Sequence, residues 1–229
     1  MADQHTSPRR RTRWHKQATN MVEHLRTQVL PVPGRRAQVR AALGNRPGDP
    51  RTFHALREIA VFLPADEDEA PEVERAFLTV AAMLCAQTAR SRTQDLNTDN
   101  DDTDSTTTQE QDSETTPSKE EHNSSSSQSL SLGASCARSV TSGLTKQTTM
   151  EQRLEALCRA NTEELHRQLP RLISHLRSLR IEVDWVDLVE DLALWHRHRQ
   201  RVRDRWARDF FRNLHRHNSD SATNTEETA

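Results

Sequence analysis

The sequence predicts an all-α protein, and three observations lead to this fold class. Apolar residues recur every three or four positions over most of the chain, which is the period of an amphipathic helix. No stretch alternates convincingly between apolar and polar residues, as a half-buried strand would. Proline and glycine mostly separate the apolar stretches. We therefore expect two small helical bundle lobes joined by a disordered acidic insertion.

The first lobe is predicted over residues 19–90 and follows a basic N-terminal arm, residues 1–18. In one of its helices the spacing of Phe53, Leu56 and Ile59 predicts a buried face. Proline and glycine residues delimit the helices that we expect at residues 19–30, 35–43, 51–62 and 71–89.

The second lobe is predicted over residues 129–217, and a disordered tail over 218–229. Order is expected to resume around Leu130–Gly133. Pro170 lies inside an otherwise regular apolar stripe, so that helix either kinks or starts again there. Helices are expected at residues 149–159 and 162–179, and on either side of a break at 196–199.

The last two predicted helices carry tryptophans in their apolar stripes and a row of arginines on the second helix. Asp184 stands at the N-cap position, before the series Trp185, Leu188, Val189, Leu192 and Trp195. Beyond the break, Trp206 belongs to an apolar stripe, so packing in the core is favoured over base stacking. The arginines are Arg201, Arg205, Arg208, Arg212 and Arg216. Because Asp204 and Asp209 stand four residues from two of them, this row taken alone favours a solvated face.

The charge is divided unevenly along the chain. The acidic insertion, residues 91–128, contains a stretch from Asp95 to Glu121 with ten acidic residues and one lysine, hence a charge of −9. The tail carries −3 and the whole chain −2, so the remaining residues carry +10. Of the basic residues 29 are arginine and three are lysine. Codon bias of a GC-rich genome is the larger cause of that ratio, but it does not explain where the arginines lie. The side chain of arginine can form two parallel hydrogen bonds to one phosphate, so the positions of the arginines matter for binding a polyanion.

Several functional classes find no support in the sequence. The three cysteines form no Cys-x-x-Cys, which argues against a disulfide scaffold and a zinc site. No apolar run reaches the roughly 18 residues of a membrane span, and no secretory signal is recognised. Phosphate-cradling and nucleophile-elbow motifs are absent. We therefore expect a cytoplasmic protein, without membrane contact, that is not an enzyme and has no catalytic residue, cofactor or metal.

Two features have alternative interpretations. Asp187 and Asp191 lie four residues apart, as an acid–base or metal-binding pair would, but a solvated acidic face or pairing with nearby arginines is the favoured interpretation. Trp14, within the basic arm, either anchors a partner or docks the arm on its own domain. The histidine pairs at 196–198 and 215–217 have a spacing that is poor for chelation on a helix.

The order of several short segments resembles the CasB family, the small subunit of the type I-E CRISPR surveillance complex Cascade. These segments are Pro33–Leu43, Leu130–Gly133, Met150–Ala160, Val183–Trp185, Asp191–Trp195 and Arg205–Phe210. The resemblance runs from about Trp14 to Arg212, apart from the acidic stretch. No single segment is diagnostic, but their order and spacing are fairly specific together.

The resemblance implies a non-enzymatic, two-lobed helical subunit that forms a dimer and contacts the backbone and large subunits of Cascade. It also implies support of the guide RNA–target DNA duplex and of the displaced DNA strand, which stabilises the R-loop. Positions that match basic residues facing nucleic acid in the family are Arg40, Arg153, Arg159, Arg171, Arg197 and Arg199. Where the family often has a further basic residue this chain has Ala134, and Arg138 is expected to take that part.

The residues themselves are compatible with this role, because scattered arginines and no base-reading motif suit support of a strand through its phosphates. A purely structural helical adaptor, whose arginines pair with acids on protein neighbours, is the alternative. The acidic insertion is longer than the family leads us to expect. We expect the insertion to loop away from the nucleic acid, or its negative charge to screen the arginines when the complex is empty.

Overall fold

The structure, a computed structural model, describes residues 12–64, 70–97 and 130–226. Over these residues the chain forms helices and no strand, which confirms the predicted all-α class. None of the helices described there combines the length and hydropathy that a membrane crossing needs.

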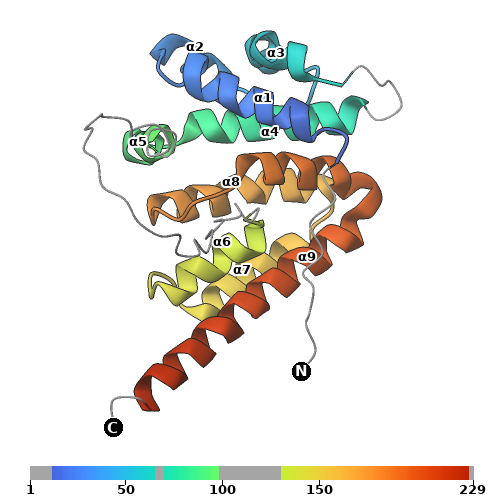
Figure 1. Ribbon diagram of the computed structural model, residues 1–229. Coiled ribbons are helices and arrows are strands. Elements are labelled where there is room, and N and C mark those ends of the chain that lie inside the picture. Colours follow the sequence, from blue (N-terminus) through green and yellow to red (C-terminus); the bar gives the residue numbers. More distant parts are fainter. Residues whose placement is uncertain (1–11, 65–69, 98–129, 227–229) are drawn as a thin grey trace, which may run out of the picture.

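The first lobe consists of five α-helices arranged about α4, which packs against α2, α3, α8 and α9. In Figure 1, α1, α2 and α3 lie on one side of α4, and α8 lies on the other. A short π-helix, Leu25–Val29, continues α1, and 3-10 turns flank α3. The bounds are α1 His15–His24, α2 Pro33–Arg40, α3 Phe53–Ile59, α4 Ala70–Ala86 and α5 Ala89–Asn97.

The second lobe contains α6 Leu132–Thr141, α7 Gln147–Arg159, α8 Thr162–Ser178 and α9 Trp185–Glu226. Pro170 lies inside α8 without ending it, so the helix does not start again there. In α9, His198 leaves helical geometry with φ −127° and ψ 32°, within the predicted break. Figure 1 shows α9 changing direction, and α6 packs extensively against this helix.

One hydrophobic core extends through both lobes. The side chains of Trp185, Trp195 and Trp206 are almost fully buried, as their register predicts. The rings of Trp195 and Trp206 lie 5.3 Å apart between centroids, on opposite sides of the kink in α9. The two halves of α9 therefore pack against each other through aromatic side chains.

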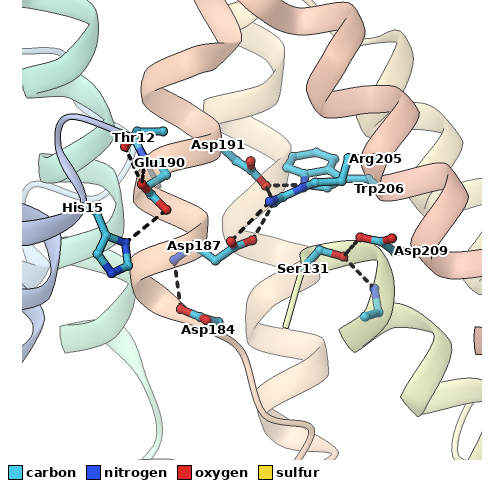
Figure 2. Close-up of polar contacts among 11 residues, drawn as sticks. Thr12, His15, Ser131, Asp184, Asp187, Glu190, Asp191, Arg205, Trp206 and Asp209 are labelled. Carbon is cyan, nitrogen blue, oxygen red and sulfur yellow. Dashed lines mark hydrogen bonds and ion pairs between the residues drawn. The ribbon is translucent and has the colours of Figure 1, made fainter. Parts of the chain in front are cut away.

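A buried ionic network joins the two halves of α9 (Figure 2). The guanidinium of Arg205 donates to both carboxylate oxygens of Asp187, with Nη1 3.2 Å from Oδ1, and also to Asp191. The indole Nε1 of Trp206 donates to Asp191 at 2.6 Å. Both aspartates are about 98% buried. The sequence favoured either a solvated acidic face or pairing with nearby arginines for Asp187 and Asp191. Pairing with an arginine is the one observed, and a solvated face is wrong for these two residues.

Two further carboxylates of α9 hold other segments against this helix. Glu190 accepts hydrogen bonds from the backbone N–H of Thr12, at 2.8 Å, and from its hydroxyl, and it lies 3.4 Å from His15. Ser131 donates to Asp209 at 2.6 Å while its own hydroxyl oxygen accepts the N–H of Ala134 and caps α6 (Figure 2). Acidic side chains of α9 thus fix where α1 and α6 begin.

Two side chains of α4 and one of α8 tie the lobes together. Arg75 donates to Glu163, with Nη2 2.9 Å from Oε2. Thr79 lies 2.8 Å from Nδ1 of the buried His166. The buried Arg177 donates to the side chain of Gln87 and to two backbone carbonyls, one of them that of Ser91. The lobes therefore form one packed body.

Some predicted boundaries need correction. Helix α1 begins at His15, inside the predicted arm, because Trp14 is buried on the domain. Helix α5 reaches Asn97, inside the predicted insertion, and its first turn is held by bonds to Arg177. Helix α9 continues to Glu226, into the predicted tail, where no proline or glycine interrupts it.

Two local expectations were also incomplete or wrong. Helix α6 was not predicted, since its sequence LGASCARSVT offers little apolar periodicity. Phe53 was expected to face the core, but 69% of it is exposed. Ala55 and Glu58 face inward on α3 instead, and Glu58 is buried because Arg35 neutralises it.

The contact between α6 and α9 predicts a sharp difference between two glycines. A Cβ on Gly133 would lie 1.9 Å from the backbone oxygen of Trp206, so the helices would have to separate. Gly34, in α2, has nothing within 4 Å of the same position. Gly133→Ala should lower the free energy of unfolding by about 1–3 kcal/mol or more. Gly34→Ala should leave it unchanged or raise it by up to about 1 kcal/mol. Denaturant unfolding measures both, and equal stability of the two variants would contradict the close packing.

A second prediction concerns acid sensitivity. Burial, together with the positive charge of Arg75, lowers the pKa of His166 to about 3. Below its ordinary pKa of 6.5 the unfolded chain binds this proton and the folded chain does not. Stability from the neutral side chain is therefore complete above pH 6.5 and decreases as the pH falls. At pH 5 the loss should be about 2 kcal/mol.

The His166→Gln variant should lose most of this dependence between pH 6.5 and pH 5. Glu163 contributes little to the pH dependence in this range. Its hydrogen bond to Arg75 lowers its pKa to about 2, so its contribution to stability is lost mainly below the ordinary pKa of 4.5. Thermal unfolding from pH 7 to 5 provides the readout, with exposed His54→Gln as the control. Equal pH dependence of all three proteins would show that His166 is not responsible.

Candidate nucleic-acid interface

The seven arginines predicted to contact nucleic acid lie on α2, α6, α7, α8 and α9. All are exposed except Arg199, which is half-buried. They do not form one cluster. Instead the structure brings some of them together in smaller groups, and each group has different neighbours.

Arg159 and Arg199 meet where the end of α7 approaches the kink of α9. The Nη2 atom of Arg199 lies 3.3 Å from the backbone carbonyl oxygen of Arg159, to which it donates. Arg159 itself lies 2.7 Å from Glu155, one turn earlier on α7, and both side chains are more than half exposed. An exposed pair of this kind contributes little free energy, so its arginine can exchange the carboxylate for another anion.

Arg153 lies on α7, and Arg171 lies on α8 near His175 in the sequence. Partial burial lowers the pKa of His175, and the positive charge of Arg153 lowers it further. Arg171 stands one turn before His175 on α8. Within the described residues neither arginine has a carboxylate within salt-bridge distance. Both therefore present uncompensated positive charge.

Arg138 and Arg197 lie apart from these groups. On α6, Arg138 has its Nη1 3.5 Å from Glu182, and both side chains are exposed. Arg197 lines a cavity of about 310 Å³ next to the start of α4, and Trp14 contributes to the same wall. Trp14 is 95% buried and the guanidinium of Arg13 lies 5.0 Å from its ring centroid. Of its two interpretations, docking of the arm on its own domain is therefore the one observed.

Arg40 lies in a basic group that the sequence revealed only in part. Its neighbour Arg35 is neutralised by the buried Glu58. Arg36 and Arg92 belong to the same group. Burial lowers the pKa of Arg92, and the positive charges of Arg36 and Arg40 lower it further. The sequence already groups Arg36 with Arg40, because four residues separate them on one helix. No sequence signal linked Arg92, because it lies in the predicted insertion.

The predicted arginine row on α9 does not behave as one face. Arg205 is turned inward to Asp187 and Asp191, whereas Arg201, Arg208, Arg212 and Arg216 are exposed. The two expected pairs on this helix are replaced, since Asp204 accepts from Gln200 and Asp209 from Ser131. The burial of Arg205 was missed because its partners stand 14 and 18 residues earlier in the sequence.

The structure also bears on the proposed metal-binding pair. The carboxylates of Asp187 and Asp191 are engaged by Arg205, whose guanidinium carries the positive charge that a metal ion would otherwise supply. Among the described residues, no group of three or more histidine, cysteine, aspartate or glutamate side chains could hold a metal ion. Burial raises the pKa of Cys85 and Cys136 to about 12, so neither thiol is a ready nucleophile.

The fold has well-matched counterparts among solved structures. A chain of a "CRISPR RNA-guided surveillance complex" is 28% identical, covers 91% of this chain and 99% of its own length, and has a TM-score of 0.72. A chain of a "CRISPR RNA-guided surveillance complex, pre-nicking" is 29% identical, with coverages of 90% and 98% and the same TM-score. The crystal structure of CasB from M. ruber is 22% identical, with coverages of 90% and 98% and a TM-score of 0.61, and it supports the fold alone.

No curated protein matches the sequence. A family model described as CRISPR-associated protein Cse2 matches residues 35–211, which is well over half of the chain. The matched range includes helices of both lobes, the kink of α9 and all seven arginines predicted to contact nucleic acid. The resemblance to the CasB family is thereby confirmed, and the chain belongs to the CRISPR-associated protein Cse2 family.

Proposed function

We propose that this protein is a non-catalytic small subunit of a CRISPR RNA-guided surveillance complex. In this role it binds the nucleic-acid backbone without sequence preference and supports the guide RNA–target DNA duplex and the displaced strand. The family membership and the likeness to two chains of surveillance complexes support the assignment. Association with other subunits, self-association as a dimer and a cytoplasmic location belong to the same proposal.

The observation that carries the proposal is the placement of exposed arginines without carboxylate partners on both lobes. Arg40 on α2, Arg153 on α7 and Arg171 on α8 are the clearest, because each is exposed and none has a salt bridge within the described part of the chain. Most other acids near arginines are already occupied internally, as with Glu58 and Glu163. The remaining positive charge can bind phosphates.

The chemistry of the surface fits a support function rather than sequence readout. Guanidinium groups on a rigid helical frame can follow a phosphate backbone, and they distinguish nucleic acid from other ligands by charge and spacing. The tryptophans are buried, so within the described residues they cannot serve as open stacking platforms for bases. Arg138, Arg159, Arg197 and Arg199 complete the proposed surface, with pairings that an incoming phosphate can replace or extend.

A structural adaptor remains the second candidate, and one observation favours it. Phe53 and Val61, at the two ends of the α3 region, are 69% and 82% exposed. Large apolar side chains of this kind suit contact with a protein neighbour. The two roles are compatible in one subunit, but only nucleic-acid binding predicts a steep dependence of affinity on salt.

Salt dependence tests the proposal directly. We expect the purified full chain to bind single-stranded DNA and an RNA–DNA hybrid, with affinity that decreases steeply as salt rises. Arg153→Gln and Arg171→Gln should each reduce the slope of log affinity against log salt by about one unit and weaken all sequences alike. Fluorescence anisotropy over a salt series provides the measurement.

Arg51→Gln is the matched control, because it removes the same charge from an exposed arginine outside the proposed surface. Its slope should equal that of the unaltered protein. Absence of binding to either nucleic acid at low salt would contradict the proposal for the isolated chain and would favour the adaptor role. Equal effects of all three substitutions would mean that only net charge matters.

A further inference from the structure

Three arginines that no carboxylate neutralises, two on α2 and one on α5, lie close enough to interact electrostatically. Arg36 and Arg40 stand four residues apart on α2 and therefore on one side of that helix. Arg92 lies in the first turns of α5. Burial lowers the pKa of Arg92, and the positive charges of Arg36 and Arg40 lower it further. Arg36 and Arg92 both act on the buried thiol of Cys85 as well.

Backbone carbonyls hold two of these guanidinium groups in place. The Nη1 atom of Arg36 donates to the carbonyl oxygen of Leu30 at 2.7 Å, where the π-helix ends. The Nη1 atom of Arg92 donates to the carbonyl oxygen of Gln87 at 2.6 Å, just beyond the end of α4. Each bond uses one N–H donor of five, so the other donors of each fork are left for a ligand. Arg40 is exposed beside them.

The comparison with Arg35 on the same helix shows what this group lacks. The guanidinium of Arg35 forms a bidentate contact with the buried Glu58, which cancels its charge. No carboxylate lies within salt-bridge distance of Arg36, Arg40 or Arg92 in the part of the chain that the structure describes. Holding like charges together in a half-buried place costs free energy, and an anion would offset that cost.

The place where Arg92 sits is also rigid. Gln87 lies in the turn between α4 and α5, and Ser91 lies in the first turn of α5. Both bind the buried Arg177 of α8. Arg177 donates to the Gln87 side chain at 2.8 Å and to the Ser91 carbonyl at 2.9 Å, while Ser91 donates to the carbonyl of Arg177 at 3.1 Å. A guanidinium anchored on such a turn loses little entropy on binding a ligand.

We infer that Arg36, Arg40 and Arg92 form a single preformed site for one backbone phosphate of the bound nucleic acid. The inference rests on the proposed function and adds Arg36 and Arg92 to its surface. A phosphate offers oxygens in several directions, so it can accept bonds from more than one planar guanidinium. Carboxylates of a protein neighbour are the rival occupant, and they would leave nucleic-acid affinity independent of these residues.

The test uses the full chain and a fluorescein-labelled 20-residue oligothymidylate, with anisotropy over a salt series. Arg36→Gln and Arg92→Gln should each weaken binding roughly tenfold and reduce the salt slope by about one unit. Because both residues bind the same phosphate, the double variant should also lose only about one unit. Its loss of affinity should be smaller than the product of the two single losses.

Arg90→Gln is the matched control, since Arg90 is an exposed arginine on the same helix, two residues from Arg92 and hence on a different side of α5. It should keep the slope of the unaltered protein. Arg36→Lys and Arg92→Lys keep the charge without the fork, and should keep the slope while lowering affinity. Circular dichroism and thermal unfolding verify that every variant is folded.

The outcomes separate the inference from the function on which it rests. If the unaltered chain binds and Arg153→Gln weakens it, but Arg36→Gln and Arg92→Gln behave like Arg90→Gln, the site is wrong and the function stands. A loss of two slope units in the double variant would mean two separate phosphates and would overturn the single site. No binding by the unaltered chain would overturn both.

Discussion

The buried contact of Arg205 with Asp187 and Asp191 is the interaction on which the shape of this protein depends. In a straight helix, residues 18 apart lie about 27 Å apart along the axis. The Nη1 atom of Arg205 nevertheless lies 3.2 Å from Asp187, because α9 turns back at His198. Burying two carboxylates without a cation would be very unfavourable, so the network forms only when the bend is made. The rings of Trp195 and Trp206, tilted by 32° to each other, then pack between the two halves.

The bend also determines which arginines become neighbours. It brings Arg199 to the end of α7, where it binds the carbonyl of Arg159. The same half-helix carries Asp209, which holds Ser131 and so the start of α6. Acidic side chains of α9 are thus engaged in contacts that build the fold. Arg40 of α2, Arg153 of α7 and Arg171 of α8, in contrast, have no acidic partner within salt-bridge distance among the described residues. This division gives an almost neutral chain a surface suited to a polyanion.

Helical periodicity predicted most of the fold because the core positions repeat along each helix. It located α7 and α8, the buried tryptophans and the break in α9. It missed α6, whose small residues carry no stripe, and it turned Phe53 inward, since periodicity alone does not distinguish an apolar residue at the edge from one in the core. For the site, the pattern could place residues on a face but could not identify partners distant in sequence. The inward orientation of Arg205 and the burial of Glu58 are therefore explained only by their partners, Asp187 and Arg35. The role of the seven selected arginines in binding nucleic acid stays a prediction.

The anchoring of the two chain ends that flank residues 98–129 has a consequence for how this sequence can vary. On one side Arg177 fixes the turn that begins α5, and on the other Asp209 fixes Ser131 at the start of α6. Both ends are thus held by side chains that do not belong to the intervening segment. Changes in the length or composition of the intervening sequence therefore leave these anchoring contacts in place. Its strongly acidic composition can accordingly vary without removing a contact that holds either lobe.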